Sequence, residues 1–361
     1  MKNKINCLQY GTMLIVIMVS AFMGIGVYCL VQAAGIDAYI TILLGILVGI
    51  PVLLLFLYIA NYEPDLALPK KLEKLYGKKI GKIMTLVCAI FIFIFANNYM
   101  FNLINFIVSQ FLPETPLLVV GIVFAILTIY TNTKGIETIS RVSLLLLVIN
   151  LILFAIGFIG LIPSMDASNL KPFLEFGIGR PLQATFYFVT LMIMPIFALL
   201  IVPKNQVVNP KSYNKSIVIS YLISLLIIFG FCIITLGILG IHLASIYQYP
   251  EYIILKHVNL FGFLDRIENI ITAQWIFGLF FCVAFAVYYI GNSIKLEHNS
   301  KMIPTSIVTL MLLASVYLIP NNTFFNSYIY YVAPILRMVS FAVFIIIAIS
   351  IFIKKRKKNS N

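Results

Sequence analysis

The chain has 361 residues, of which 62% are hydrophobic and only 10% are charged. Soluble domains carry about 25% charged residues, so this composition excludes an ordinary soluble protein and predicts a polytopic membrane protein. The net charge of +13 does not indicate nucleic-acid binding, because the basic residues cluster in alternate polar gaps. We expect them to orient the chain and to contact anionic lipids, and we predict no nucleic-acid partner.

Ten apolar segments fill the chain, at about 20 residues for each membrane span. They cover residues 8–31, 39–60, 83–111, 116–130, 142–162, 181–202, 217–241, 267–290, 303–318 and 333–353. The first segment and the small residues after it also resemble a signal peptide, but 24 apolar residues exceed the roughly 7 to 15 of a signal-peptide core. We therefore expect it to span the membrane, and residues 1–361 to form a single all-α membrane domain.

The ten segments divide into two halves of five, over about 8–162 and 181–353. Segments 4 and 9, with 15 and 16 residues, are both short and occupy corresponding positions in the two halves. This correspondence predicts an inverted repeat of five plus five helices. No identity between the halves is evident, so the symmetry is inferred from segment lengths and breaks.

The distribution of Lys and Arg predicts the orientation. With the N-terminus inside, 20 of the 25 basic residues fall in cytoplasmic gaps and tails, including the basic tail 354–361, and four fall outside. The remaining one, Arg337, lies within segment 10. We therefore expect both termini in the cytoplasm.

Three polar gaps are long enough to hold short helices. The outer gaps 163–180 and 242–266 mix apolar and polar residues, and we interpret them either as lids over a cavity or as packed connectors. The inner gap 61–82 contains Pro69 before a basic amphipathic stretch, which predicts a helix lying in the membrane interface.

Helix-breaking residues interrupt segments 1 and 6. Gly24, Ile25 and Gly26 predict an opened backbone whose outer half-helix directs free N–H groups at the midplane, where they suit a carboxylate. Carbonyl groups near Met194, before Pro195, would suit an ammonium group. A zwitterion fits both breaks. The alternative is that the glycines form a helix-packing patch and that Pro195 is a simple kink.

A polar stripe lies on the outer half of segment 3. Asn98, Asn102, Asn105 and Ser109 recur at helical spacing, so they face the bundle interior, either to bond other helices or to contact ligand or water. All twelve acidic residues fall in gaps or at segment ends, which argues against a carboxylate proton relay. The chain shows no catalytic constellation and no metal-ligand spacing, so we expect no enzyme activity, no metal and no cofactor.

Several stretches, in order and spread along nearly the whole chain, resemble one family. They are Ala34-Gly35-Ile36-Asp37-Ala38, Leu112-Pro113-Glu114-Thr115-Pro116, Lys134-Gly135-Ile136-Glu137 with Arg141, Ser168-Asn169-Leu170 with Pro172 and Gly177, Tyr249-Pro250-Glu251-Tyr252, and Gly262-Phe263-Leu264-Asp265-Arg266-Ile267-Glu268 with Trp275. They resemble the spore germination permeases, the B subunits of nutrient germinant receptors, in the amino acid, polyamine and organocation transporter superfamily. The resemblance implies a LeuT-like ten-helix inverted repeat with broken helices 1 and 6.

The same resemblance implies a role and a pocket. The role is to sense a small nutrient, usually an amino acid, in the spore inner membrane, together with an A subunit and a lipoprotein C subunit. The family often has Gly-Glu where this chain has Ile193-Met194, and some members have a basic residue at the position of Cys282. By position, the implied pocket between segments 1, 3, 6 and 8 comprises Gly24, Ile25, Gly26, Asn98, Asn102, Met194, Pro195 and Cys282.

Three functions are compatible with this sequence. The first is a ligand-sensing receptor subunit, the second a secondary amino acid transporter of the same fold, and the third a ligand-free scaffold for the receptor complex. Receptor and transporter share the pocket and differ in whether ligand crosses the membrane.

Overall fold

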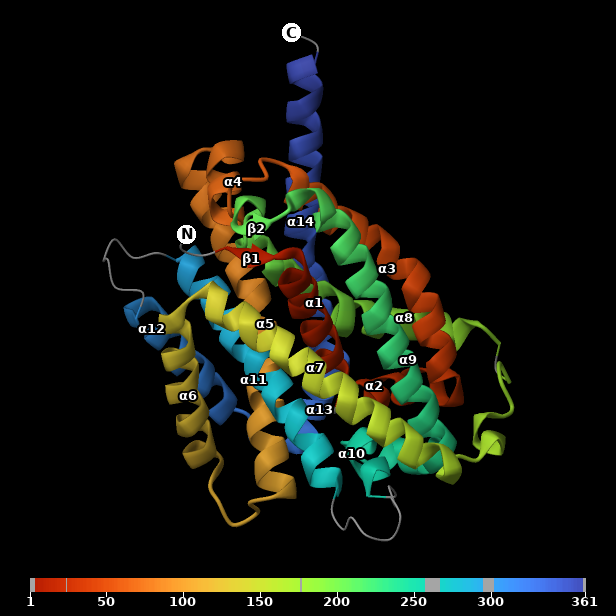
Figure 1. Ribbon diagram of the computed structural model, residues 1–361. Coiled ribbons are helices and arrows are strands. Elements are labelled where there is room, and N and C mark those ends of the chain that lie inside the picture. The colour runs from red at the N-terminus through yellow and green to blue at the C-terminus, as the bar shows by residue number, and fades with distance from the viewer. Residues whose placement is uncertain (1–3, 24, 176, 257–266, 295–301, 360–361) are drawn as a thin grey trace.

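The computed structural model describes residues 4–23, 25–175, 177–256, 267–294 and 302–359, and this part of the chain is almost entirely helical (Figure 1). The helices are α1 (Cys7–Phe22), α2 (Gly26–Ala34), α3 (Ala38–Asn61), α4 (Leu68–Tyr76), α5 (Lys78–Gln110), α6 (Leu117–Lys134), α7 (Ile136–Leu161), α8 (Gly179–Phe188), α9 (Tyr213–Ile246), α10 (Pro250–Leu255), α11 (Ile267–Ser293), α12 (Met302–Tyr317), α13 (Asn322–Ser327) and α14 (Ala333–Asn359). Two short strands, β1 (Ile5–Asn6) and β2 (Val207–Val208), pair in parallel near the N-terminus.

Apolar helices account for every predicted segment. Within the described residues, eight helical stretches are long and apolar enough to cross a membrane, and α1 and α12 are shorter apolar helices of 16 residues each. Large apolar side chains such as Leu226, Ile246 and Leu318 remain exposed on the outer faces of the bundle. Exposed apolar surface of this extent suits lipid rather than water. The chain is therefore an all-α, multi-pass integral membrane protein.

Segment 4 is longer than predicted. The helix α6 has 18 residues, because it continues through its polar end to Lys134 and stops at Gly135, where φ is +81°. Asn132 belongs to this extension, and its amide donates to the carbonyls of Thr128 and Ala284 at 2.9 and 3.1 Å. The pairing of two short segments is thus weaker than the sequence suggests, since only α12 keeps the predicted length.

The first segment is interrupted at the predicted place. α1 ends at Phe22, Met23 has φ −58° and ψ 124°, and α2 begins at Gly26. Gly24 lies outside the described residues. Ile25 precedes α2, and its side chain makes no capping hydrogen bond to the helix.

Segment 6 differs from the prediction of an open break. After α8 the chain forms a π-helical turn (Val189–Ile193) and then a 3-10 stretch (Met194–Ile201), so its backbone remains helical throughout. Pro195 is the second residue of the 3-10 stretch and has no N–H to donate. The π turn ends at Ile193, with Met194 between it and Pro195, and π turns are frequent at functional sites.

Segments 6 and 8 form the centre of the bundle. About 89% of the apolar window in Gly179–Ile201 and 72% of that in Thr272–Ser293 is buried, against 28% in α6. The helix α1 packs against α7, α9 and α11, and α11 packs against α5. Figure 1 shows α6 and α12 at the edge of the bundle.

The two ends of the bundle carry different short helices. α4 is the predicted interfacial helix, and it buries Leu68, Lys71 and Leu72. It lies at the same end as β1, β2 and the last turns of α14, which project beyond the other helices (Figure 1). α10 lies at the opposite end, where the gap 163–180 forms the 3-10 turns Ile162–Ser164 and Ala167–Leu170. Both described chain ends therefore lie on one side, as an even number of crossings requires.

Candidate functional site

The break in segment 1 is held by an acidic residue from the outer gap. Glu251, on α10, is 1% exposed, and its Oε1 accepts a hydrogen bond of 3.2 Å from the backbone N–H of Val27 in the first turn of α2. The helix N-terminus that we predicted to hold a ligand carboxylate thus binds a carboxylate of the protein itself. Although the sequence places Glu251 in a loop, the fold brings it to the break.

Gly26 fits the packing alternative as well as the ligand prediction. A Cβ atom at this position would lie 2.4 Å from Cδ2 of the buried Phe22 ring, so any larger residue would displace that ring. Ile25 is also buried. The close approach of α1 and α2 at the break therefore requires glycine whether or not a ligand binds there.

A small cavity lies between the four segments predicted to form the pocket. Its volume is about 10 Å³, the room for about one water molecule. Its lining residues are Ile17 of α1, Ile92, Phe95 and Tyr99 of α5, Pro195 and Ala198 of the 3-10 stretch, and Cys282, Phe285 and Ala286 of α11. Pro195 and Cys282 are thus brought together as expected. Met194 is fully buried beside Pro195 but does not line this cavity.

The residues of the polar stripe in segment 3 differ in their hydrogen bonding: some bond to the protein, and others have no partner among the described residues. Asn105 donates to the Tyr249 hydroxyl, and Ser109 donates to the Phe106 carbonyl, so the outer end of the stripe bonds the protein. Deeper in the bundle, both amide atoms of Asn98 and Oδ1 of Asn102 are buried and have no hydrogen-bond partner in the described part of the chain. Such atoms mark a place for water or ligand.

Arg337 is a candidate residue that our sequence prediction did not include. It lies on α14, is 1% exposed, and holds its guanidinium 4.7 Å from the centre of the Phe95 ring. Its Nε and Nη1 atoms have no hydrogen-bond partner among the described residues. The sequence contained the signal, because a lone charge inside an apolar segment is by default a functional-site hypothesis.

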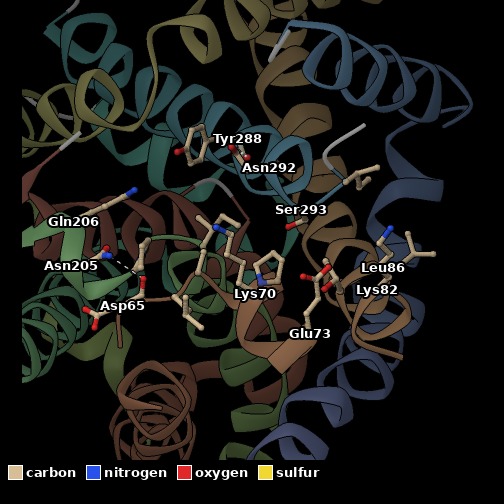
Figure 2. A pocket seen from close by; sticks show the side chains of 17 residues that line it. Asp65, Lys70, Glu73, Lys82, Leu86, Asn205, Gln206, Tyr288, Asn292 and Ser293 are labelled. Atoms are coloured by element: carbon tan, nitrogen blue, oxygen red, sulfur yellow. Dashed lines mark hydrogen bonds between the residues drawn. The ribbon is translucent and has the colours of Figure 1, made fainter. Parts of the chain in front are cut away.

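A larger cavity opens at the end of the bundle that contains α4. It has a volume of about 680 Å³, within the range of small-molecule sites. Figure 2 shows Lys70, Glu73 and Lys82 on one side of it and Asp65, Asn205 and Gln206 on the other, with Tyr288, Asn292 and Ser293 of α11 above. Asn205 donates to the Asp65 carbonyl at 3.0 Å.

The two cavities follow the same helix faces. Ile201 and Tyr288 line the large cavity, and Ala198 and Phe285, three residues earlier on the same elements, line the small one. Residues three apart lie on one face of a helix. The large cavity therefore begins about one helical turn from the small cavity, along the same faces of the 3-10 stretch and of α11.

Comparisons with known proteins relate the chain to one family. A family model described as "Spore germination protein" matches residues 4–323. The chain is 27% identical to spore germination protein KB of Bacillus subtilis (strain 168) over 263 residues, which are 71% of this chain and 69% of that protein. It is 21% identical to spore germination protein XB of Bacillus anthracis over 338 residues, which are 92% of this chain and 93% of that protein.

Proposed function

The chain belongs to the spore germination protein family, and from that premise we propose that it is the membrane subunit of a nutrient germinant receptor. In this proposal it binds a small nutrient of the amino acid type in the spore inner membrane and signals to an A subunit and a lipoprotein C subunit. It is not an enzyme. Both termini face the cytoplasm, and the ten segments form a LeuT-like inverted repeat of five plus five helices.

The observation that supports this proposal is the small cavity between segments 1, 3, 6 and 8. It lies beside Pro195, where the helix changes its winding, and near the buried amides of Asn98 and Asn102. Irregular backbone inside a membrane bundle is tolerated where it lines a cavity. The volume of about 10 Å³ corresponds to a closed site, which has to expand to admit a nutrient.

A second candidate function is secondary transport of an amino acid. The large cavity favours it, because its lining continues along the helix faces that reach the small cavity and so marks an inward route. The third candidate, a ligand-free scaffold, is favoured only by the small volume of the central cavity.

Germination of spores that lack this gene tests the proposal. We expect the deletion to abolish the germination response to at least one amino acid of a panel of twenty, and the intact gene to restore it. Uptake of the same radiolabelled amino acid should be equal in membranes with and without the protein. Uptake that depends on the protein would instead favour the transporter, and an unchanged germination response to the whole panel would contradict the receptor function.

A further inference from the structure

Arg337 places an uncompensated positive charge at the middle of the membrane span. Its helix continues to Lys354, 17 residues later, which is about 25 Å of α-helix and close to half the thickness of a bilayer with its interfaces. The guanidinium is buried and lies on the Phe95 ring. Burying a charge in this way is costly unless the charge is paired.

No acidic residue in the described part of the chain pairs with Arg337. The two buried acidic residues are engaged elsewhere, since Asp37 accepts from the backbone N–H of Leu174 at 2.8 Å and Glu251 accepts from that of Val27. The ion pairs of the described residues, Lys74 with Glu63 and Arg141 with Glu137, lie at other positions. The guanidinium lies instead on the Phe95 ring, and the Tyr99 ring stacks against Phe95 with the two ring centres 6.4 Å apart.

The unpartnered atoms around Arg337 favour a negatively charged acceptor. Arg337 offers Nε and Nη1, and Tyr99, whose ring stacks against Phe95, offers a buried hydroxyl that also has no partner among the described residues. An arginine can only donate hydrogen bonds, and a tyrosine hydroxyl can donate one. A carboxylate oxygen accepts such bonds, and charge-assisted bonds between guanidinium and carboxylate are among the strongest in proteins.

The guanidinium is one aromatic ring away from the small cavity. Phe95 and Tyr99 both line that cavity, and Arg337 lies against the ring of Phe95. A rotation of this ring would connect the cavity with the guanidinium.

We infer that Arg337 binds the carboxylate of the ligand, and that the Tyr99 hydroxyl donates a second hydrogen bond to it. This inference rests on the proposed function, and it assigns the ligand class as a small molecule with a free carboxylate. In the first turn of α2, the N–H of Val27 already donates to Glu251 of the protein itself.

The test uses the full-length protein, purified in detergent, and twenty amino acids, each measured for thermal stabilisation. Every amino acid that stabilises the protein is compared with its carboxamide, such as L-alanine with L-alaninamide, which keeps the ammonium group and loses the negative charge. We expect the acid to bind the wild type about 30-fold or more tightly than the amide, because removing one member of a buried charge pair has an effect of this size.

Variants separate the role in binding from a role in folding. Arg337→Gln should reduce affinity for the acid by about 30-fold or more and leave affinity for the amide within about 3-fold. Tyr99→Phe should weaken acid binding several-fold. Arg141→Gln, which removes an exposed arginine from α7, is the matched control and should change neither. If Arg337→Gln fails to fold, the difference in affinity between acid and amide on the wild type still tests whether the site requires a carboxylate.

The outcomes distinguish the two proposals. An amide that binds the wild type as tightly as the acid, or an acid that binds Arg337→Gln as tightly as the wild type, would overturn the inference and leave the receptor function standing. If no amino acid stabilises the wild type, the proposed function fails and the inference fails with it.

Discussion

The carboxylate of Glu251 and the backbone N–H of Val27 are hydrogen-bonded across 224 residues of sequence. This bond fastens α10, in the outer gap, to the first turn of α2. Four other residues of α10, Pro250, Tyr252, Ile254 and Leu255, are buried with Glu251. The helix α10 is therefore a packed part of the bundle at the break between α1 and α2.

Glu251→Ala should destabilise the purified protein by about 1–3 kcal/mol, because it leaves the buried N–H of Val27 without this acceptor. Glu251→Gln keeps an acceptor oxygen of the same shape and should recover most of the loss. Thermal melting in detergent measures both variants. Equal destabilisation by Ala and Gln would show that the charge, and not the hydrogen bond, matters at this position.

Gly26→Ala should destabilise the protein by about 1–3 kcal/mol, since the added Cβ would lie 2.4 Å from the Phe22 ring. Gly26→Leu should abolish the ligand response while insertion into the membrane stays intact. Thermal melting and protein level in membranes measure these effects. Gly179→Ala is the matched control, because a Cβ there meets no atom within 4 Å. Phe22→Leu should partly rescue Gly26→Ala, and a lack of rescue would contradict the packing argument.

Lys71 makes stability depend on pH. It is 5% exposed on α4, and its Nζ donates to the carbonyls of Ile59 and Ala60 at 3.0 and 2.8 Å. Burial lowers the pKa of Lys71 to about 7, and the charge of Lys204 acts in the same direction. Above this pH the folded protein loses a proton that the unfolded chain, with a lysine pKa near 10.4, retains. Stability should therefore rise as the pH rises from about 7.

The comparison with Lys71→Met measures this contribution. Between pH 6.5 and 8.5 the stability of the wild type relative to Lys71→Met should increase by about 2 kcal/mol, at up to 1.36 kcal/mol for each pH unit above the pKa. Lys70→Met, which removes an exposed lysine of the same helix, is the control for the loss of one positive charge. A difference that does not change with pH would rule out titration of Lys71 in this range.

Cysteine labelling tests the side on which the large cavity opens. In a Cys7→Ser background the four remaining natural cysteines are buried. A membrane-impermeant maleimide should label Ser293→Cys, in the large cavity, in inside-out vesicles and not in right-side-out vesicles. Ser168→Cys, on an exposed turn of the gap 163–180, should show the opposite pattern. Labelling of both variants from one side would contradict the predicted orientation.

Much of the fold could be predicted because local patterns determine it. The apolar segments follow from hydrophobicity alone, and Gly26 marks the start of α2, where a Cβ atom would meet the Phe22 ring. Segment 6 was harder. A proline within a helix indicates a disturbance, but whether the chain opens or rewinds into π and 3-10 turns at Pro195 depends on the neighbouring helices.

The sequence indicated which four segments line the small cavity, but it did not indicate where the buried charged residues Glu251 and Arg337 lie. Pro195 and Cys282 both line the small cavity. Arg337 stands out in the sequence as a lone charge in an apolar segment, but tertiary packing decides that it lies on Phe95 and that Glu251 binds Val27. Gly24 lies outside the described residues, and the ligand role of the other predicted residues stays a prediction.

The helix α14 joins the middle of the membrane to the end of the bundle where both chain termini lie. Arg337 is one turn into a helix of 27 residues, about 40 Å long, and the far half of that helix is tied to α4. Tyr76 donates to the Ser350 hydroxyl at 2.8 Å, and Lys354 donates to the Lys74 carbonyl at 2.9 Å. Lys70 and Glu73 of α4 line the large cavity. A tilt of α14 at the buried end that carries Arg337 would therefore move α4 and the side chains of Lys70 and Glu73 in the large cavity.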